Sequence, residues 1–404
     1  MLQQQDNRSG RRTSATSPHH GGEIVLGGKS LSPSALWEFA QGALLPDRRA
    51  AITYAPQAVQ RIRAATDLLG KLVDAEEPVY GVNTGFGHFA NTVIPTEKII
   101  ELQYNLVRSH CCGVGEPLSR DIVMAMWLIT LSTICRGHSG VRLEVLETIS
   151  KILEAGILSC VPSQGSVGAS GDLAPSAHAT LAVLGEGRCT MPQGDAFVEL
   201  PAAEAIRRAG LKPVSLGPKE GLSLMNGTSL TTSLGVRAWY EGRYLLDVAN
   251  LAAAMSIEAL GGSRTICQEE TMRAHGHPGT IACGHALAEW LGRGSGLAKI
   301  HLDSYQVQDP YSLRCAPHVH GAVWEELDQS GAVLQREIDA TTDNPLLFPG
   351  EMMAVCCGNF HAIYPARVND RLASAFATLA NISERRINLA MRAPRGHLHT
   401  FLVD

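Results

Sequence analysis

The stretch Gly165–Asp172, which reads Gly-Ser-Val-Gly-Ala-Ser-Gly-Asp, holds the residues best suited to unusual chemistry. Its glycines stand at every third position, and glycine permits close backbone approaches that a Cβ atom forbids. The amide nitrogen of Gly171 could therefore reach the carbonyl carbon of Ala169 and close a five-membered ring. Loss of two waters would then turn Ser170 into a dehydroalanine, an electrophile of a kind that no ordinary side chain offers.

Three plainer interpretations compete for this stretch. A glycine-rich turn without chemistry explains the triplet alone equally well. A phosphate-binding loop requires G-x-G-x-x-G or a Walker A pattern, whereas the spacing here is G-x-x-G-x-x-G. A nucleophilic elbow requires G-x-S-x-G, but Asp172 stands where the second glycine would be. The triplet by itself leaves the turn and the electrophile open, and the rest of the chain decides between them.

The longer run Gly165–Pro175, in which Leu-Ala-Pro follows Asp172, resembles the signature of the MIO-dependent ammonia-lyases and aminomutases. The similarity extends from about Leu31 to the last residue and is closest to the histidine ammonia-lyases (histidases). It implies a prosthetic group, 4-methylideneimidazol-5-one (MIO), that forms autocatalytically from Ala169, Ser170 and Gly171. No external cofactor is expected.

Two further family motifs precede the triplet. Tyr80 begins Tyr-Gly-Val-Asn-Thr-Gly-Phe-Gly, and the resemblance gives this tyrosine an acid/base role, for which its environment must tune the phenol. The pair Ser109–His110 ends Asn-Leu-Val-Arg-Ser-His. In the family such a pair goes with imidazole substrates, whereas tyrosine-specific relatives have His-Leu and phenylalanine-specific ones an apolar pair. Without this context, Tyr80 would be a buried residue beside a turn and His110 a structural histidine.

Two candidate substrate contacts follow the triplet. Asn226, in Leu-Met-Asn-Gly-Thr, is either the N-cap of the next helix or, by the resemblance, a contact to the substrate or the prosthetic ring. Phe360, in Gly-Asn-Phe-His, is expected to line the pocket. Cys357 stands before this segment where a small residue is usual, and Ile363 where a polar one is common. These departures concern the fine geometry of the pocket.

The motif Gln308–Arg314, which reads Gln-Asp-Pro-Tyr-Ser-Leu-Arg, predicts the start of a helix with the aspartate as N-cap and the proline as first helical residue. A cation near a helix start is poorly placed unless an anion joins it. We therefore expect Arg314 to bind a substrate carboxylate through a bidentate fork, although outside this motif it would be read as a surface arginine. By the resemblance Gln308 also binds the substrate and Tyr311 is catalytic.

The triplet, Asn226 and Gln308–Arg314 each fall at a predicted helix N-terminus. Converging N-termini would create a positive pocket, because their free N–H groups and dipoles favour anions. Such a pocket suits the carboxylate of an amino acid and a transition state with growing negative charge.

The bulk properties narrow the functional class. The 404 residues are 45% hydrophobic and 18% charged, which is enough for a large core and for two domains. A net charge of -5 gives no reason to expect nucleic acid or a membrane as a partner. The ten cysteines form no CxxC pair, so we expect reduced thiols and a cytoplasmic location. No metal is expected, because three His-x-His pairs lack a third ligand at a diagnostic spacing. These pairs are His275/His277, His318/His320 and His397/His399.

Helical periodicity predicts a mainly α fold. We expect a disordered polar tail over residues 1–22, a smaller N-terminal domain with the MIO loop over 23–202, and an elongated helical bundle over 203–404. Residues 189–200 are expected to form a small hairpin or loop. The predicted helices cover Leu31–Leu44, Ala55–Asp74, Glu97–Arg108, Asp121–Cys135, Val141–Ala155, Asp172–Gly185, Thr228–Leu260, Val323–Asp339 and Pro365–Met391.

The resemblance implies a carbon–nitrogen lyase that eliminates ammonia from L-histidine to give trans-urocanate. It also implies a homotetramer in which each active site is drawn from three chains. One alternative is another aromatic amino acid ammonia-lyase or an aminomutase, against which Ser109–His110 argues. A second is a non-catalytic homologue, because the family's chains continue beyond the length seen here and the bundle is expected to be truncated at Asp404.

Overall fold

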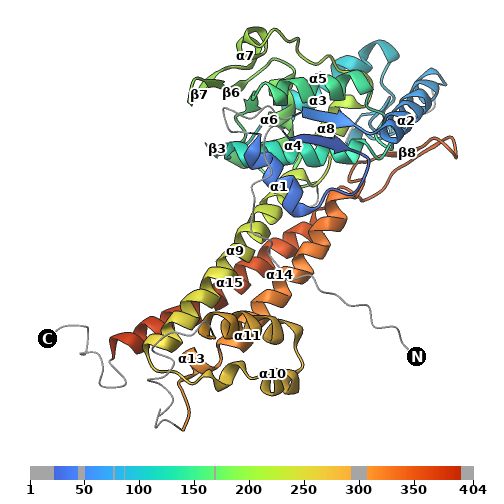
Figure 1. Ribbon diagram of the computed structural model, residues 1–404. Helices are drawn as coiled ribbons and strands as arrows, with labels where there is room; N and C mark the ends of the chain where they lie inside the picture. Colours follow the sequence, from blue (N-terminus) through green and yellow to red (C-terminus); the bar gives the residue numbers. More distant parts are fainter. Residues whose placement is uncertain are drawn as a thin grey trace.

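The computed structural model describes residues 22–43, 51–75, 78–85, 87–167, 170–292 and 307–392. Most of the polar tail expected at the N-terminus lies outside these residues, as do Gly168, Ala169 and the segment 393–404. The mainly α fold is confirmed: a head of short helices and small sheets stands above a bundle of long helices (Figure 1).

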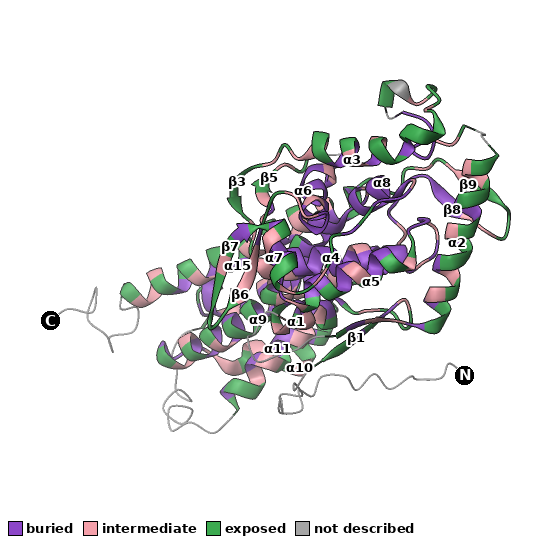
Figure 2. Cartoon of the chain, turned by 90° about the horizontal axis from the view of Figure 1, so that it is seen from above, coloured by how far each residue is buried: buried purple, intermediate pink, exposed green. Residues whose placement is uncertain are grey.

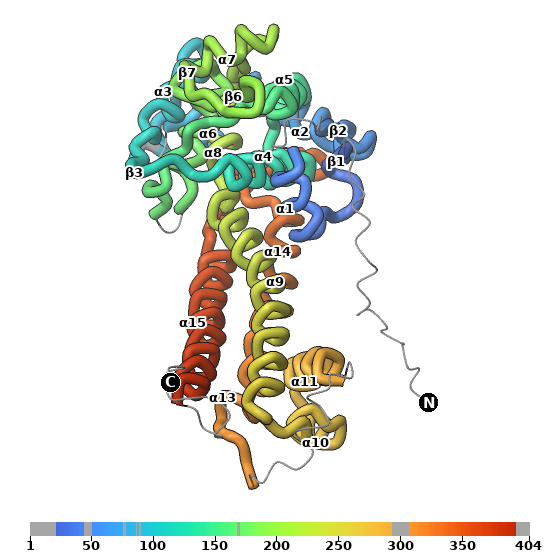
Figure 3. The backbone as a smooth tube through the Cα atoms, turned by 60° about the vertical axis from the view of Figure 1, so that its left-hand side comes forward, coloured from blue at the N-terminus to red at the C-terminus, as the bar shows by residue number. Residues whose placement is uncertain are grey.

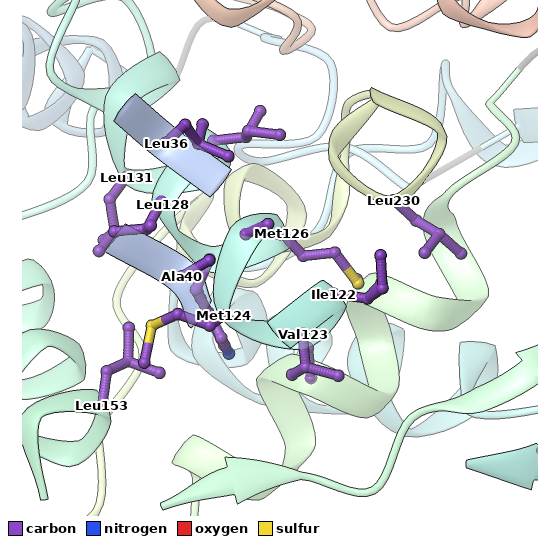
Figure 4. Packing of buried hydrophobic residues seen from close by; sticks show 14 of the residues in the cluster. Leu36, Ala40, Ile122, Val123, Met124, Met126, Leu128, Leu131, Leu153 and Leu230 are labelled. Atoms are coloured by element: carbon purple, nitrogen blue, oxygen red, sulfur yellow. The ribbon is translucent and has the colours of Figure 1, made fainter. Parts of the chain in front are cut away.

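The head is built around α4 (Arg120–Ile134), which is buried on almost every side. A helix that is apolar all round must lie inside a protein rather than on its surface. Around it pack α1 (Pro33–Gly42), α5 (Leu143–Glu154) and the first turns of α9 (Ser229–Ala259). Figure 4 shows the α4 side chains among Leu36 of α1, Leu153 of α5 and Leu230 of α9.

The other helices of the head are α2 (Pro56–Asp74), α3 (Ile99–His110), α6 (Leu173–Val183), α7 (Ala202–Arg208) and α8 (Glu220–Met225). Of these, α6 and α8 are themselves mostly buried, whereas α2, α3 and α7 each expose one face, as the burial view from above shows (Figure 2). Neither α7 nor α8 is among the helices predicted from the sequence. Both pack against α6, and the domain boundary after residue 202 stays a prediction.

Small sheets join distant segments of the head. In the first, β1 (Glu23–Leu26) pairs in parallel with β2 (Ala51–Tyr54). In the second, β3 (Val114–Pro117) pairs antiparallel with β5 (Pro162–Gln164), which brings the chain after α3 beside the chain before the triplet loop. The third has the order β4 (Leu158–Ser159), β6 (Arg188–Gln193), β7 (Ala196–Pro201), and it confirms the predicted hairpin. The fourth pairs β8 (Leu346–Phe348) with β9 (Met353–Val355).

The bundle consists of α9, α14 (Ala316–Ile338) and α15 (Ile363–Met391), which run side by side (Figure 3). The predicted bounds of α9 and α15 agree within two residues, whereas α14 begins seven residues before the predicted Val323. Small residues bring the helices close together. A Cβ on Gly242 would collide with the ring of Phe376 on α15, so the absence of a side chain allows the two helices to approach closely.

Three helices that the sequence analysis did not predict in this form close the far end of the bundle. They are α10 (Glu269–His275), α11 (Pro278–Leu291) and the single turn α13 (Tyr311–Arg314). Leu313 of α13 and Leu287 of α11 share an apolar cluster with Ile257 and Leu260, near the end of α9. The far end is therefore a separate small core. Among the described residues no helix is both long and apolar enough to cross a membrane.

Candidate active site

The loop before α6 is closed by its own backbone. The amide of Val167 donates a hydrogen bond of 3.1 Å to the carbonyl of Gly171, so the chain reverses its direction within the signature. Ser170 is half-buried at this turn, and Ala169 lies outside the described residues. The closure supplies the kind of close backbone approach that cyclisation of the triplet requires.

Asp172, directly after the triplet, anchors the loop. Its buried carboxylate accepts 2.8 Å hydrogen bonds from both the backbone amide and the hydroxyl of Thr231, in the first turn of α9. A third hydrogen bond, of 2.9 Å, comes from the hydroxyl of Ser166. Burial raises the pKa of Asp172, and the hydrogen bonds from Thr231 and Ser166 act in the opposite direction. The triplet loop is thus held against the N-terminus of α9.

His110 ends α3, close to the same loop. Its Nδ1 lies 2.9 Å from the carbonyl oxygen of Leu106 and 3.1 Å from the hydroxyl of Ser109. A carbonyl oxygen can only accept, so this pattern assigns the ring proton to Nδ1 and makes Nε2 an acceptor. Beyond His110, the amide of Gly113 donates to His178 Nε2 on α6 at 3.1 Å. Together with the β3–β5 pairing, this contact fixes the end of α3 beside the triplet segment.

Gln103 on α3 connects the Tyr80 loop with α8. Its side-chain amide donates to the carbonyl of Gly81 at 3.4 Å, and its side-chain oxygen accepts from the amide of Leu222 at 3.1 Å. Tyr80 itself is half-buried, and the loop is stabilised by Asn83, whose side chain accepts from the amide of Val79 at 2.7 Å. The Tyr80 loop, α3 and α8 therefore form one connected layer of the head.

Asn226 is not the N-cap of α9, which corrects that interpretation of its position. It ends α8, a helix that the sequence analysis did not predict, and Thr228 precedes the first residue of α9. The side-chain amide of Asn226 donates to the carboxylate of Asp343 at 3.3 Å and to the carbonyl of Asn344 at 3.2 Å. The residue is half-buried, so it keeps contact with solvent while its orientation is fixed.

The same turn holds the segment that carries Phe360. The side-chain oxygen of Asn344 accepts a 2.7 Å hydrogen bond from the amide of Cys357, and the Cys357 thiol donates to the carbonyl of Asp343 at 3.5 Å. Phe360 is half-buried three residues further on. The structure thus brings the segments of Asn226 and Phe360 together in the head.

The Gln308–Arg314 motif forms the turn α13, but its helix start differs from the prediction. The helix begins at Tyr311, so Pro310 rather than Asp309 is the N-cap. The carboxylate of Asp309 instead accepts a 2.6 Å hydrogen bond from the amide of Ser263. Arg314 donates through Nε to the carbonyl of Asp309 at 2.8 Å, and its guanidinium carbon lies 4.6 Å from the centre of the Tyr311 ring. Gln308 and Tyr311 are exposed.

The candidate residues occupy two distant places in one chain. Thr231, which binds the carboxylate next to the triplet, lies in the first turn of α9, whereas Ile257, which packs with Leu313, lies at its end. An α-helix rises 1.5 Å per residue, so these two points are about 40 Å apart. Ser170 therefore lies in the head and Arg314 at the far end of the bundle (Figure 3). The predicted convergence is therefore incomplete in a single chain: the N-termini of α6 and α9 meet at Asp172, whereas α13 lies at the far end of α9.

The His-x-His pairs do not assemble into a metal site among the described residues, where no cluster of three or more potential ligands was found. The ring of His275 lies 4.6 Å from the rings of both His277 and His318. His320 is buried between Asn250 and Arg386. The third pair, at 397 and 399, lies outside the described residues.

Known proteins share both the sequence and the fold of this chain. The family model described as aromatic amino acid lyase matches residues 31–404. The chain belongs to the aromatic amino acid lyase family. It is 45% identical over 345 residues to a histidine ammonia-lyase of Deinococcus radiodurans, and the match covers 85% of this chain and 65% of that protein. The chain therefore spans less than two thirds of the length of that relative.

Solved structures of aromatic amino acid lyase type have the same fold. The crystal structure of histidine ammonia-lyase from Trypanosoma cruzi superimposes with a TM-score of 0.82 at 36% identity, covering 94% of this chain and 70% of that one. Tyrosine aminomutase from Streptomyces globisporus gives a TM-score of 0.84 at 30% identity, covering 94% and 73%. The fold is thus common to lyases and aminomutases, and the substrate must be inferred from the site.

Several residues that position the candidate site of this lyase were not among the functional residues predicted from its sequence. Gln103 carried a usable signal, because it is a polar residue on the buried face of an otherwise amphipathic helix. Asp172 stood within the signature itself. Thr231 and Asp343 gave no local signal, since their importance comes from partners 59 and 117 positions away in sequence.

Proposed function

We propose that this protein is a histidine ammonia-lyase, which eliminates ammonia from L-histidine without oxidation and releases trans-urocanate. The observation that carries the proposal is His110 at the end of α3, beside the triplet segment. Its Nδ1 is engaged by Leu106, so Nε2 can accept a hydrogen bond from the N–H of a substrate imidazole. The relatives named as histidine ammonia-lyases support the same substrate.

We also propose that Ala169, Ser170 and Gly171 form the MIO group, with no external cofactor. The closed turn between Val167 and Gly171 and the anchoring of Asp172 fit such a group, because both restrain the backbone around the triplet. When formed, the group supplies an electrophilic methylidene carbon. The remaining residues bind and orient the substrate and move its protons.

Arg314 is the proposed ligand of the substrate carboxylate. Its Nε is tethered to the carbonyl of Asp309 and its plane lies over Tyr311, so little freedom remains to be lost on binding. Its two terminal nitrogens make no hydrogen bond to a described residue and can form a bidentate fork with a carboxylate. Gln308 is a second proposed contact from this turn.

Tyr80 and Tyr311 are the proposed acid/base residues, and Asn226 and Phe360 the remaining substrate contacts. The Tyr80 loop is bound to α3 in the head, whereas Tyr311 begins α13 at the far end of the bundle. A site that uses both tyrosines therefore requires a head and a bundle end to meet. Asn226 can donate or accept a hydrogen bond, and Phe360 can pack against an imidazole ring. These roles come from the family resemblance and the positions of the side chains.

The separation of about 40 Å along α9 leads us to propose that sites form between copies of the chain, in a homotetramer. An exposed apolar stripe on α9 supports this arrangement, because an unpaired stripe of this kind marks an interaction surface. It consists of Leu234, Tyr244, Leu245, Val248 and Met255. We also propose a cytoplasmic location, which the ten free thiols favour.

Complementation tests the shared site. Ser170→Ala and Arg314→Leu chains are expected to be inactive alone. Co-expressed, they should regain activity, because about a quarter of randomly assembled sites would receive both wild-type residues from different copies. Mixed oligomers without any regained activity would place both residues in the same chain's site and contradict the proposal.

Product analysis tests the reaction. Purified protein with L-histidine should release ammonia and urocanate in equal amounts, and phenylalanine and tyrosine should be poor substrates. An aminomutase is the second candidate, because tyrosine aminomutase shares the fold at 30% identity. A β-amino acid as the main product would favour that candidate.

A further inference from the structure

Lys219 is a fully buried cation that the proposed reaction does not use. It precedes the first residue of α8 and has a left-handed backbone with φ 63°, which a lysine rarely adopts. Its ammonium donates to the carbonyl of Ser139 at 3.1 Å, the hydroxyl of Ser223 at 2.8 Å and the carboxylate of Asp343 at 2.7 Å. All three N–H groups of the ammonium are thus used, as a buried charge requires.

The carboxylate of Asp343 transmits this contact to the candidate substrate residue Asn226. While its Oδ2 binds Lys219, its Oδ1 accepts from the amide of Asn344 at 2.7 Å and from the side chain of Asn226 at 3.3 Å. Asn226 also donates to the carbonyl of Asn344 at 3.2 Å. One buried ion pair therefore fixes the turn that orients the Asn226 amide.

Stability alone explains this pair poorly. A buried ion pair is often no more stabilising than an apolar pair of similar size, because both ions lose their hydration. Lys219 also keeps a backbone conformation that glycine would adopt without strain. The buried pair instead holds Asp343 at one place and in one orientation, which is what Asn226 needs.

We propose that Lys219 is a positioning residue, which through Asp343 fixes the side-chain amide of Asn226 for substrate binding. The inference rests on the proposed role of Asn226. In this proposal Lys219 does not contact the substrate. It holds the carboxylate of Asp343 in place, and that carboxylate orients Asn226, which contacts the substrate.

The chain offers a matched control one residue further on. Glu220 is also buried at the start of α8, and its carboxylate pairs with Arg142 at 2.7 and 2.9 Å. Arg142 also donates to the carbonyl of Ser215. This second ion pair anchors the same helix and makes no contact with Asp343 or Asn226 among the described residues. Breaking it tests a structural role alone.

The test is a double-mutant cycle in the full-length protein. Lys219→Met should lower kcat/KM for histidine by about 10²-fold, the scale of a 1 Å misplacement, whereas Arg142→Met should lower thermal stability and leave kcat/KM within a few-fold. In an Asn226→Ala background, Lys219→Met should cause little further loss, because the residue it positions is absent. An equal loss in both backgrounds would overturn the proposal.

Two additional measurements keep the positioning role testable if a variant misfolds or if the proposed function is wrong. Lys219→Met with Asp343→Asn leaves no unpaired buried charge, so stability should recover while kcat/KM stays low; joint recovery of both would show a merely structural role. Hydrogen exchange should rise in peptides covering 222–228 and 341–345 for Lys219→Met but not for Arg142→Met. This readout applies even if wild-type protein makes no urocanate, and unchanged exchange would overturn the positioning role.

Discussion

Thr231 holds the carboxylate of Asp172 with two hydrogen bonds of 2.8 Å, one from its backbone amide and one from its hydroxyl. The contact ties the start of the longest bundle helix to the residue that directly follows the triplet. Because free amides at a helix N-terminus favour an anion, the helix itself contributes to holding Asp172. The geometry of the triplet loop therefore depends on a side chain outside every recognised motif.

We expect Thr231→Val to loosen this anchor. A hydrogen bond to a buried charged group contributes about 1.5–3 kcal/mol, so the midpoint of thermal unfolding should fall and formation of the prosthetic group should slow. Thr378→Val is the control, because the hydroxyl of Thr378 is exposed and bonds only to its own helix. Equal behaviour of the two variants would show that the Thr231 hydroxyl is dispensable.

Intact-mass measurement tests the chemistry of the triplet. The mature chain should weigh less than its calculated mass by two waters. Ser170→Ala should show the full calculated mass and no activity, whereas Ser166→Ala keeps the triplet and should still lose both waters. An active wild-type chain of unmodified mass would exclude the proposed electrophile.

Replacement of Arg314 by lysine should weaken substrate binding. Lysine keeps the charge but lacks the planar fork, and the expected loss is about 1.5–3 kcal/mol, seen as a higher KM for histidine. Arg273→Lys is a suitable control, because Arg273 is a surface arginine paired with Glu269. If both variants bind histidine like the wild type, the carboxylate is held elsewhere.

Exchange of Ser109–His110 for Ala-Leu should change the substrate preference. The pair would no longer offer the acceptor nitrogen that an imidazole N–H needs, so kcat/KM for histidine should fall by about 10²-fold or more and phenylalanine could become a substrate. Competition between the two amino acids measures the ratio directly. An unchanged preference for histidine would place specificity in another residue.

His320 should make the protein less stable in mild acid. Burial, followed by the charge of Arg386, lowers the pKa of His320 from 6.5 to about 3. The unfolded chain then binds more protons than the folded one between these values, so this stability is complete above pH 6.5 and is lost as the pH falls towards 3. Between pH 7 and pH 5 the loss is about 2 kcal/mol.

Denaturation at these two pH values checks this prediction. His320→Gln has no titrating group, so it should show a smaller change of unfolding free energy between pH 7 and pH 5 than the wild type. Glutamine can still donate to Asn250, the partner of His320 at 2.7 Å. An equal pH dependence in both proteins would show that His320 is not responsible.

The sequence predicted the long helices well, because periodicity and flanking glycines are local signals. Gly227 before α9 and Gly261 after it mark that helix within two residues. Short elements were harder to predict: α8 and α13 have six and four residues, too few for a period to appear. The wrong N-cap interpretation of Asn226 followed directly from the missing α8.

The motifs named the candidate residues but not their distances. Ser170 and Arg314 are separated by the length of α9. No motif in the sequence predicts this separation. Lys219 gave no sign of burial, since its partner Asp343 is 124 positions away and Ser139 is 80 positions away. Contacts of this kind depend on the tertiary fold, which a single sequence read locally does not contain.

The length of α9 sets the distance between the head and the far end of the bundle. Each residue adds 1.5 Å and turns the helix by about 100°, so its length can change only in fixed steps. A single insertion between Thr231 and Ile257 would both displace and rotate α13 relative to the triplet loop. Many exposed positions along α9 should therefore accept a different side chain, yet few should accept a change in residue number.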